Sequence, residues 1–191
     1  MFTALLDTCV LWPSLQRDVL LSLAAEGMYR PAWSSVILAE LEYEQAAKLT
    51  RRGVAPADAG DRAAHLIRQM RQAFDDAEIT GWEGLEGTYG LPDPDDEHVV
   101  AAAVVAGAGA IITLNTKDFP ATLLPSGLET LRPAEFRQHR RPRPAPRTAR
   151  HPHHRRSNRR PGAGSTAAEL LDILVRRYGF DDAVDQLRSI Q

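Results

Sequence analysis

The sequence predicts an α/β fold of three layers, in which helices cover both faces of a mostly parallel sheet of about four or five strands. Over residues 1–136, short apolar runs alternate with longer stretches of helical periodicity. The run at 110–114 has the length and the β-branched residues of a buried parallel strand. Polar side chains follow directly after two of the runs, and in a parallel sheet functional groups gather beyond such strand ends.

A strand, an acid and a helix are predicted at the start of the chain. The apolar run that ends at Leu6 stops at Asp7. Apolar residues then recur at helical spacing over 15–23, until Gly27 ends the pattern. Residues 28–32 form the second strand candidate.

The next predicted element is a helix that follows this second strand. Ser34 or Ser35 can cap its first turn, because a serine hydroxyl accepts hydrogen bonds from free backbone amides. The helix is expected to run to about Leu49, before Gly53 stops it.

A longer amphipathic helix is predicted to begin at Asp58 or Asp61. Its apolar face is marked by residues four positions apart, which are Leu66, Met70 and Phe74. Residues 77–80 form the third strand candidate, and 82–88 are expected to hold one helical turn.

The last predicted elements surround an acidic loop at 91–97. This loop leads into a small apolar helix at 99–106, which Gly107 closes. The strand at 110–114 and a final strand at 128–131 complete the sheet. Right-handed crossovers then connect the parallel strands through the helices.

Composition limits the class of protein. The one cysteine, Cys9, allows neither an intramolecular disulfide nor a cysteine-based zinc site, which favours a cytoplasmic protein. The first residues lack the basic lead-in of a signal peptide. The longest nearly uncharged stretch, 99–112, is shorter than the roughly 18 residues that a membrane span needs. No membrane association is therefore expected.

Charge is distributed unevenly along the chain. Residues 1–136 carry 10 basic and 20 acidic residues, whereas 137–160 carry 10 arginines and no acid. Because nucleic acids repel an acidic surface, a body of net charge −10 would bind them poorly unless metal ions neutralise some carboxylates. The acids are therefore the candidates for chemistry.

The strongest acidic candidates are Asp7 and the cluster before residue 99. Asp7 closes a buried strand, where a carboxylate is either satisfied by backbone amides or used on a ligand. Four acids in five positions precede the apolar helix, although one would suffice to cap it: Asp93, Asp95, Asp96 and Glu97. Since mutual repulsion makes it costly to keep them all ionised, a cation would stabilise this cluster.

Two further positions are weaker candidates. Glu40 lies in the first turns of its predicted helix, and helical geometry does not distinguish it from Glu42 or Glu44 as the acid that faces the sheet. Asn115 and Asp118 follow a predicted strand end, but such residues also serve in turns.

Taken together, these oxygen ligands indicate a site for Mg²⁺ or Mn²⁺ rather than zinc. Such ions bind phosphate and water alongside a few carboxylates. The matching reaction is the hydrolysis of phosphoester bonds.

The order of the motifs resembles the PIN domain, particularly its VapC-type toxin branch, over about residues 3–136. The resemblance is carried by four segments, which are Leu-Leu-Asp-Thr ending at Thr8, Pro31–Leu41 with Glu40, Leu91–Ala103 with Asp96, and Ile112–Pro120. It implies a ribonuclease that acts as the toxin of a toxin-antitoxin pair, is held inactive by a cognate antitoxin protein, and is often a homodimer.

The resemblance also implies site residues. Asp7, Glu40 and Asp96 would be the catalytic metal ligands, for Mg²⁺ or alternatively Mn²⁺. The fourth family position is often Asp but is Asn115 here, so Asp93, Asn115 and Asp118 are secondary candidates. This departure leaves open whether one or two metals bind.

Other functions fit the sequence less well. Asp7 stands where haloacid dehalogenase-like phosphatases carry their nucleophile, but their second Asp is replaced by Cys9. No nucleotide-binding glycine motif is present. The main alternative is a degenerate PIN fold that binds RNA or a partner protein without cleaving, which Asn115 keeps open.

The sequence changes character after Phe136. Residues 137–164 are rich in Arg, Pro and His and form no predicted core, so they are either a disordered linker or an RNA-binding segment. A third interpretation is a frameshifted remnant of ordinary helices, which resequencing the gene would test. Residues 165–191 regain helical periodicity and are expected to form a C-terminal helical segment.

Overall fold

A computed structural model describes residues 1–136 of the chain. Residues Met1–Pro133 form one compact unit. The predicted linker at 137–164 and the predicted helical segment at 165–191 lie outside the described residues.

Five parallel strands form one sheet, which confirms the predicted fold class. The strands are β1 (Thr3–Leu6), β2 (Arg30–Ser34), β3 (Glu78–Ile79), β4 (Ala110–Ile112) and β5 (Glu129–Leu131). Their order is β3-β2-β1-β4-β5, and every neighbouring pair is parallel. All carboxyl ends therefore open at the same edge of the sheet.

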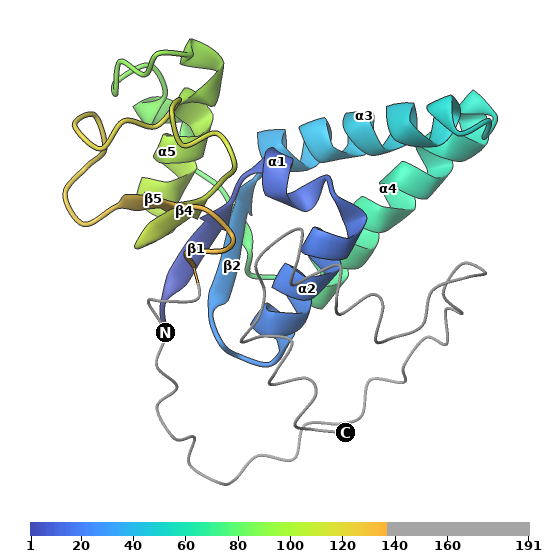
Figure 1. Cartoon of the computed structure of the whole chain (residues 1–191), viewed down its shortest axis with the longest axis horizontal. Helices are drawn as coiled ribbons and strands as arrows, with labels where there is room; N and C mark the ends of the chain where they lie inside the picture. The colour runs from blue at the N-terminus through green and yellow to red at the C-terminus, as the bar shows by residue number, and fades with distance from the viewer. Residues whose placement is uncertain (137–191) are drawn as a thin grey trace, which may run out of the picture. The chain divides into compact units, whose positions relative to one another are not determined.

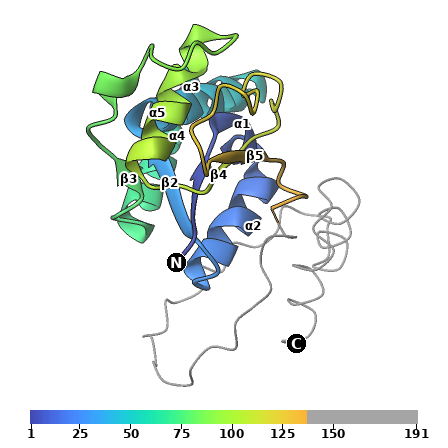
Figure 2. The same ribbon diagram turned by 90° about the vertical axis from the view of Figure 1, so that its left-hand side faces the viewer.

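Helices flank this sheet on both sides. The α-helices are α1 (Thr8–Leu11), α2 (Ser14–Ala25), α3 (Ser35–Arg51), α4 (Pro56–Ala73) and α5 (Glu97–Val105), and the 3₁₀ turns are η1 (Glu83–Leu85) and η2 (Pro94–Asp96). Figures 1 and 2 show α2 and α5 on opposite sides of the strands, while α3 and α4 lie side by side and extend away from the sheet. The connections place polar residues at the carboxyl edge.

The core lies between the central strand and the helices. All four residues of β1 are buried, and Leu5 and Leu6 are fully enclosed. Burial of such a leucine stabilises the fold by about 1.5–3 kcal/mol. The first seven residues of α5 are also buried, and its three consecutive alanines let the helix approach the sheet closely.

Several predicted boundaries differ from the observed ones, and in two cases the reason is local. The strand expected at 28–32 is β2 and begins at Arg30, because the Met28 amide still donates to Leu23 of α2 at 3.1 Å. The helix expected to begin at Asp58 or Asp61 begins at Pro56. Proline suits the first helical position, since its φ is already helical and it has no amide to satisfy.

The acidic loop before α5 contains a short 3₁₀ turn. Pro94–Asp96 form the turn η2, and the Asp93 carboxylate accepts a hydrogen bond from the Asp95 amide at 3.0 Å. Asp96 thereby becomes the N-cap residue of α5.

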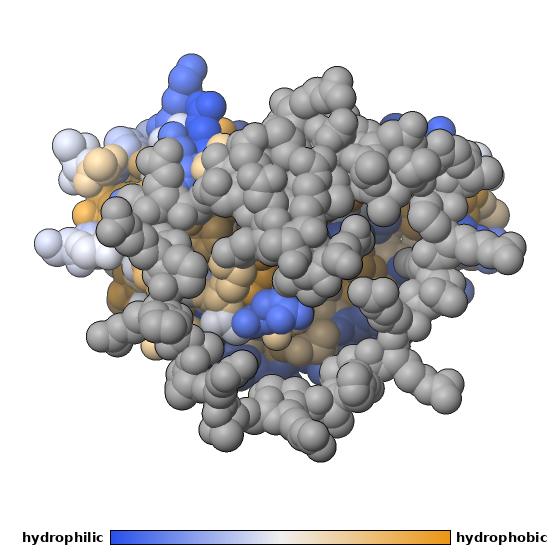
Figure 3. Space-filling model, turned by 60° about the horizontal axis from the view of Figure 1, so that its bottom comes forward, coloured by the Kyte–Doolittle hydropathy of each residue, from blue (hydrophilic) through white to orange (hydrophobic). Residues whose placement is uncertain are grey.

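Within residues 1–136, none of the helices is long and apolar enough to cross a membrane. Hydrophobic and hydrophilic areas both reach the visible surface on the face drawn in Figure 3. Tyr43 of α3 is the most exposed aromatic side chain among the large hydrophobic residues of this part of the chain, at 73%.

Candidate active site

The candidate residues follow three different strands at the carboxyl edge of the sheet. Asp7 comes directly after β1, and Asn115 and Asp118 lie in the loop after β4. Glu40 is on α3, which begins immediately after β2, and Asp96 begins α5. Residues separated by about a hundred positions therefore meet at this edge.

Asp7 is held by side chains rather than by backbone amides. Its carboxylate is buried and makes no capping hydrogen bond to α1. Instead, Oδ2 accepts hydrogen bonds from the Thr113 hydroxyl at 2.6 Å and from the Cys9 thiol at 3.0 Å. Both bonds go to the same oxygen, so Oδ1 is the atom that Asp7 can offer to a ligand.

Cys9 and Thr113 form the support of Asp7. Burial raises the pKa of the Cys9 thiol to about 12, and the negative charge of Asp7 adds to this effect. The thiol therefore stays protonated and can donate to Asp7, while its sulfur accepts the Leu114 amide at 3.1 Å. Thr113 is fully buried at the end of β4. Sequence reasoning missed this support, because the bond from Thr113 to Asp7 spans 106 positions.

Asp96 carries the clearest electrostatic signal of the site. Its pKa is raised to about 6, first by burial and then by the carboxylates of Asp7, Asp93 and Asp118, whereas His98 acts in the opposite direction. These four aspartates are called the acid cluster below. Asp96 is thus surrounded by like charges, and a cation bound here would relieve their repulsion.

Glu40 is linked to the acid cluster through Thr8, which follows Asp7, and through His98, which lowers the pKa of Asp96. The Thr8 hydroxyl donates to Oε2, and His98 Nε2 lies 3.6 Å from Oε1. The proximity of His98 lowers the pKa of Glu40, and the Thr8 bond contributes in the same direction, while burial opposes them. Glu40 is therefore ionised at neutral pH. Among the three glutamates that the sequence left open, it is the one in contact with Thr8, the neighbour of Asp7.

His98 was not predicted as a site residue. It is buried at 3% exposure, and its Nδ1 lies 3.3 Å from the Ser34 hydroxyl. The Ser34 oxygen also accepts the Ile37 amide at 3.1 Å, and in the tautomer in which the Ser34 hydroxyl donates to Nδ1, the Nε2 hydrogen is directed toward Glu40. His98 therefore connects the starts of α3 and α5. The available signal was a histidine directly after the acid run, inside an otherwise apolar helix.

Glu97 belongs to the fold rather than to the acid cluster. It is buried, and its two oxygens accept the amides of Leu91 at 2.9 Å and Tyr89 at 3.0 Å. Burial alone would raise its pKa, but the surrounding backbone amides together hold the pKa below its ordinary value. Sequence reasoning counted Glu97 with the neighbouring acids by charge, whereas its role is to organise the loop before η2.

The secondary candidates lie in turns, and two of them, Asp93 and Asp118, are close enough to Asp96 to raise its pKa. Asn115 is exposed, its amide donates to the Thr113 hydroxyl at 3.0 Å, and its carbonyl accepts the Asp118 amide at 3.0 Å. Asp93 is also exposed and caps η2. These residues therefore make turn hydrogen bonds, as one interpretation of the sequence expected. The charges of Asp93 and Asp118 also raise the pKa of Asp96.

The donor atoms suit a hard divalent cation. In residues 1–136 no group of three or more His, Cys, Asp or Glu side chains is arranged closely enough to hold a metal ion directly. The groups that meet at this edge are nevertheless carboxylates, which Mg²⁺ and Mn²⁺ prefer, and Mg²⁺ commonly binds through one or two carboxylates with water completing its shell. The crowding around Asp96 fits such an ion.

Comparison with known proteins supports the resemblance to the PIN domain. A family model described as PIN domain matches residues 3–117, which is more than half of the chain. The match covers β1 through β4, including Asp7, Glu40 and Asp96. A search of curated proteins found no match.

Proposed function

The chain belongs to the PIN-domain family, whose members are typically nucleases, and from this premise we propose that it is a metal-dependent endoribonuclease. The proposed substrate is single-stranded or loop RNA. Mg²⁺ is the proposed cofactor, with Mn²⁺ as the alternative, and Asp7, Glu40 and Asp96 are its proposed ligands.

One observation carries this proposal. The pKa of Asp96 is raised to about 6 at a position where three other aspartates surround it. Such repulsion destabilises the fold unless a ligand compensates it, and strongly perturbed carboxylates cluster at functional sites. The acid cluster is therefore better explained as a cation site than as helix capping.

A bound metal ion would activate water, brace the scissile phosphate and neutralise the leaving oxygen. The protein's own part is to hold the carboxylates in place. Thr113 and Cys9 fix Oδ2 of Asp7 and leave Oδ1 for the ligand. Asp96, which is only half-buried, can accept a hydrogen bond from the attacking water and orient it.

Glu40 of α3 is the third proposed ligand, after Asp7 and Asp96. Thr8 and His98 each contact one of its oxygens and keep it ionised, as a metal ligand must be, and each oxygen retains a further lone pair for a metal ion. A second ion would require Asp93, Asn115 or Asp118, of which Asp93 and Asn115 are exposed and Asp118 is half-buried.

RNA cleavage by the purified full chain tests the proposal. Labelled RNA of several sequences would be incubated with Mg²⁺, Mn²⁺ or EDTA, alongside Asp7→Asn and Asp96→Asn. We expect cleavage with either metal, none in EDTA and little in the variants. Undiminished cleavage in EDTA, or in both variants, would contradict the metal mechanism.

We further propose that this activity makes the chain the toxin of a toxin-antitoxin pair, acting in the cytoplasm, with a cognate antitoxin as partner and a homodimer as its active form. The support is the motif order of the VapC-type branch. Induced expression should arrest bacterial growth, Asp96→Asn should abolish the arrest, and co-expression of the product of the adjacent gene should relieve it. Growth arrest that persists with Asp96→Asn would contradict this role.

Asn115 favours one rival, a PIN fold that binds RNA or a protein without cleaving. This rival predicts RNA binding with no cleavage of any substrate under any metal. Asn115→Asp tests the rival, because it adds a fourth carboxylate to the site. If the missing carboxylate is what prevents cleavage, this variant should cleave RNA where the wild type does not. Full activity of the wild type excludes the rival.

A further inference from the structure

A group of basic residues surrounds the first turn of α2. Lys48 Nζ donates to the Ser14 hydroxyl at 3.1 Å and lies 5.0 Å from the centre of the Trp12 ring. Burial lowers the pKa of Lys48, and the charges of Arg52 and Arg17 lower it further, whereas the charge of Asp18 opposes them. Arg17, Lys48 and Arg52 are called the basic cluster below. Like charges are therefore gathered here, as they are in the acid cluster.

The N-terminus of α2 lacks the acidic or capping side chain that usually stabilises a helix start. The first turn of α2 contains no acidic residue, and its N-cap residue, Pro13, makes no side-chain hydrogen bond. A helix N-terminus carries partial positive charge and normally attracts an acid, whereas the neighbours here are cations. Arg17 is buried at 6% exposure, its Nη1 group donates to the Leu11 carbonyl at 3.2 Å, and only its Nε has no hydrogen-bond partner within residues 1–136. The carboxylate of Asp18 lies 3.5 Å from Arg17 and offsets part of the charge.

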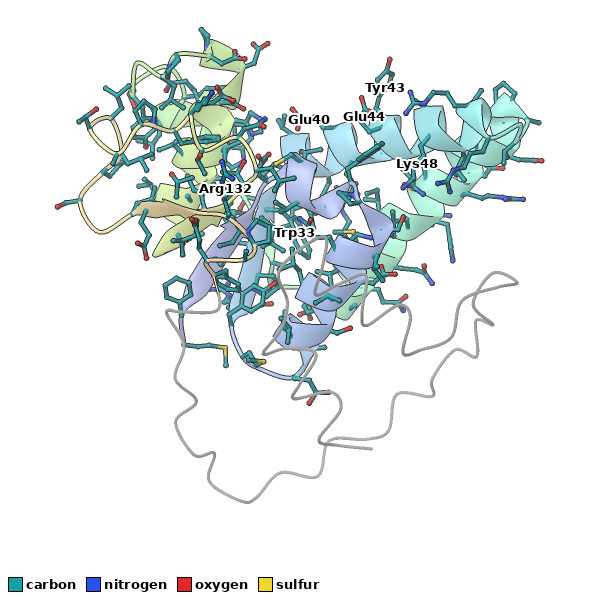
Figure 4. All side chains as sticks on the ribbon, in the orientation of Figure 1. Trp33, Glu40, Tyr43, Glu44, Lys48 and Arg132 are labelled. Atoms are coloured by element: carbon teal, nitrogen blue, oxygen red, sulfur yellow. The ribbon has the colours of Figure 1, made fainter. Side chains whose placement is uncertain are left out.

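The basic cluster shares its structural elements with the proposed site. Lys48 and Glu40 lie on α3, eight residues apart, and therefore about 12 Å apart along the helix axis. Trp12 is the C-cap of α1, the single helical turn of which Asp7 is the N-cap. Figure 4 shows Glu40, Glu44 and Lys48 following one another along α3, with Tyr43 projecting from the helix. A strand bound at the acid cluster can thus continue along α3 toward Lys48.

We propose that the basic cluster binds a backbone phosphate of the RNA strand, at a nucleotide outside the scissile bond. The proposal rests on the endoribonuclease function above. Residues 1–136 carry a net charge of −10, so an RNA strand needs local cations to be held near the acid cluster. Lys48 supplies the partly exposed ammonium, Ser14 and the Trp12 ring position it, and the buried Arg17 strengthens the positive potential.

The salt dependence of RNA binding tests this site. Fluorescence anisotropy with a labelled single-stranded RNA would be measured for the full chain in EDTA, which prevents metal-dependent cleavage. Each phosphate that the protein neutralises contributes about 0.7 to the steepness of log K against log salt concentration. We expect Lys48→Gln to lower the slope by this amount and to weaken binding several-fold at low salt, while Lys48→Arg retains the slope.

Arg62→Gln is the matched control, because it removes one positive charge from an exposed position on α4. It should leave the slope unchanged, and equal melting temperatures would show that the variants are folded. An unchanged slope in Lys48→Gln, an equal loss in Arg62→Gln, or no RNA binding by the wild type overturns the proposal. Weakened binding of an acidic polypeptide with unchanged RNA binding overturns it in favour of a protein partner.

These outcomes are separable from those of the nuclease proposal. If no RNA is cleaved with Mg²⁺ or Mn²⁺ but Lys48→Gln still lowers the slope, the phosphate site stands and the nuclease function fails. If cleavage depends on metal but the slope does not change, the nuclease function stands and the phosphate site fails.

Discussion

Two consecutive carboxylates at the start of α5 meet opposite surroundings. Asp96 is half-buried and faces three other aspartates, which together with burial raise its pKa to about 6. Glu97 is more deeply buried, yet its pKa lies below the ordinary value because backbone amides surround it. The partners of a carboxylate, more than its burial, therefore separate a residue that holds the fold from one that is proposed to bind a ligand.

The largest expected difference between the two residues is in catalysis. Asp96→Asn should lower the rate of RNA cleavage by about 10³-fold, equivalent to about 4 kcal/mol, because it removes a proposed metal ligand. Asp95→Asn is the matched control, since it removes the same charge from the exposed neighbouring position. Initial rates with saturating Mg²⁺ would measure both. An equal loss in both variants would indicate a general charge effect rather than a ligand.

In contrast to catalysis, the stability of the fold is expected to depend more on Glu97 than on Asp96. Glu97→Ala should lower the free energy of unfolding by about 3 kcal/mol, because it leaves the buried amide of Leu91 and the part-buried amide of Tyr89 without their acceptor. Glu97→Gln should cost less, since it retains one acceptor oxygen. Urea unfolding in EDTA would measure both, with Asp96→Asn as the comparison. A loss of less than about 0.5 kcal/mol in Glu97→Ala would mean that the loop does not depend on this carboxylate.

His98 follows Glu97 in α5 and contacts Glu40, so it links the helix of the first comparison to a proposed metal ligand. His98→Ala should lower cleavage by about 10- to 100-fold, which is the usual cost of removing a group that orients a metal ligand. His98→Gln should recover part of this loss, because its amide can still donate toward Glu40. Unfolding measurements on the same variants would separate positioning from stability. Full activity of a folded His98→Ala protein would show that Glu40 needs no such support.

The fold was largely predictable because its central strands are short apolar runs bounded by turn residues. The strand at β1 and the strand at β4 were recognised in this way, and parallel pairing then placed Asp7 near the loop that holds Asn115. The start of β2 was missed, because the amide of Met28 is tied to the end of α2, which no periodicity reveals.

Only those site residues could be predicted from the sequence that stand at a strand end or within a cluster of acids. Asp7 was marked by its strand end and Asp96 by the crowding of acids, whereas the resemblance alone selected Glu40. Thr113 and His98 carry no such mark, because their roles depend on contacts across 106 and 64 positions. Counting acids also grouped Glu97 with Asp96, since charge in a sequence does not show which amides will surround it.

The smallest expected effect is a difference in pH dependence between the two carboxylates of α5. The pKa of Asp96 is about 6 in the folded chain and 3.8 ordinarily, so the folded state holds its proton more tightly. Its contribution to the stability of the metal-free protein therefore falls as pH rises from about 4 to 6. Glu97 has a lowered pKa, so its contribution is lost as pH falls below its ordinary value of 4.5.

The difference between variants isolates these contributions from other titrating groups. In EDTA, Asp96→Asn should gain stability relative to the wild type as pH rises from 4 to 7, whereas Glu97→Gln should lose most relative to the wild type at pH 7. Saturating Mg²⁺ should reduce the advantage of Asp96→Asn, because a bound cation compensates the repulsion at Asp96. Melting temperatures across this pH range would measure the effect. If both variants follow the wild type in parallel, the two carboxylates are electrostatically equivalent, and the acid cluster does not need a cation.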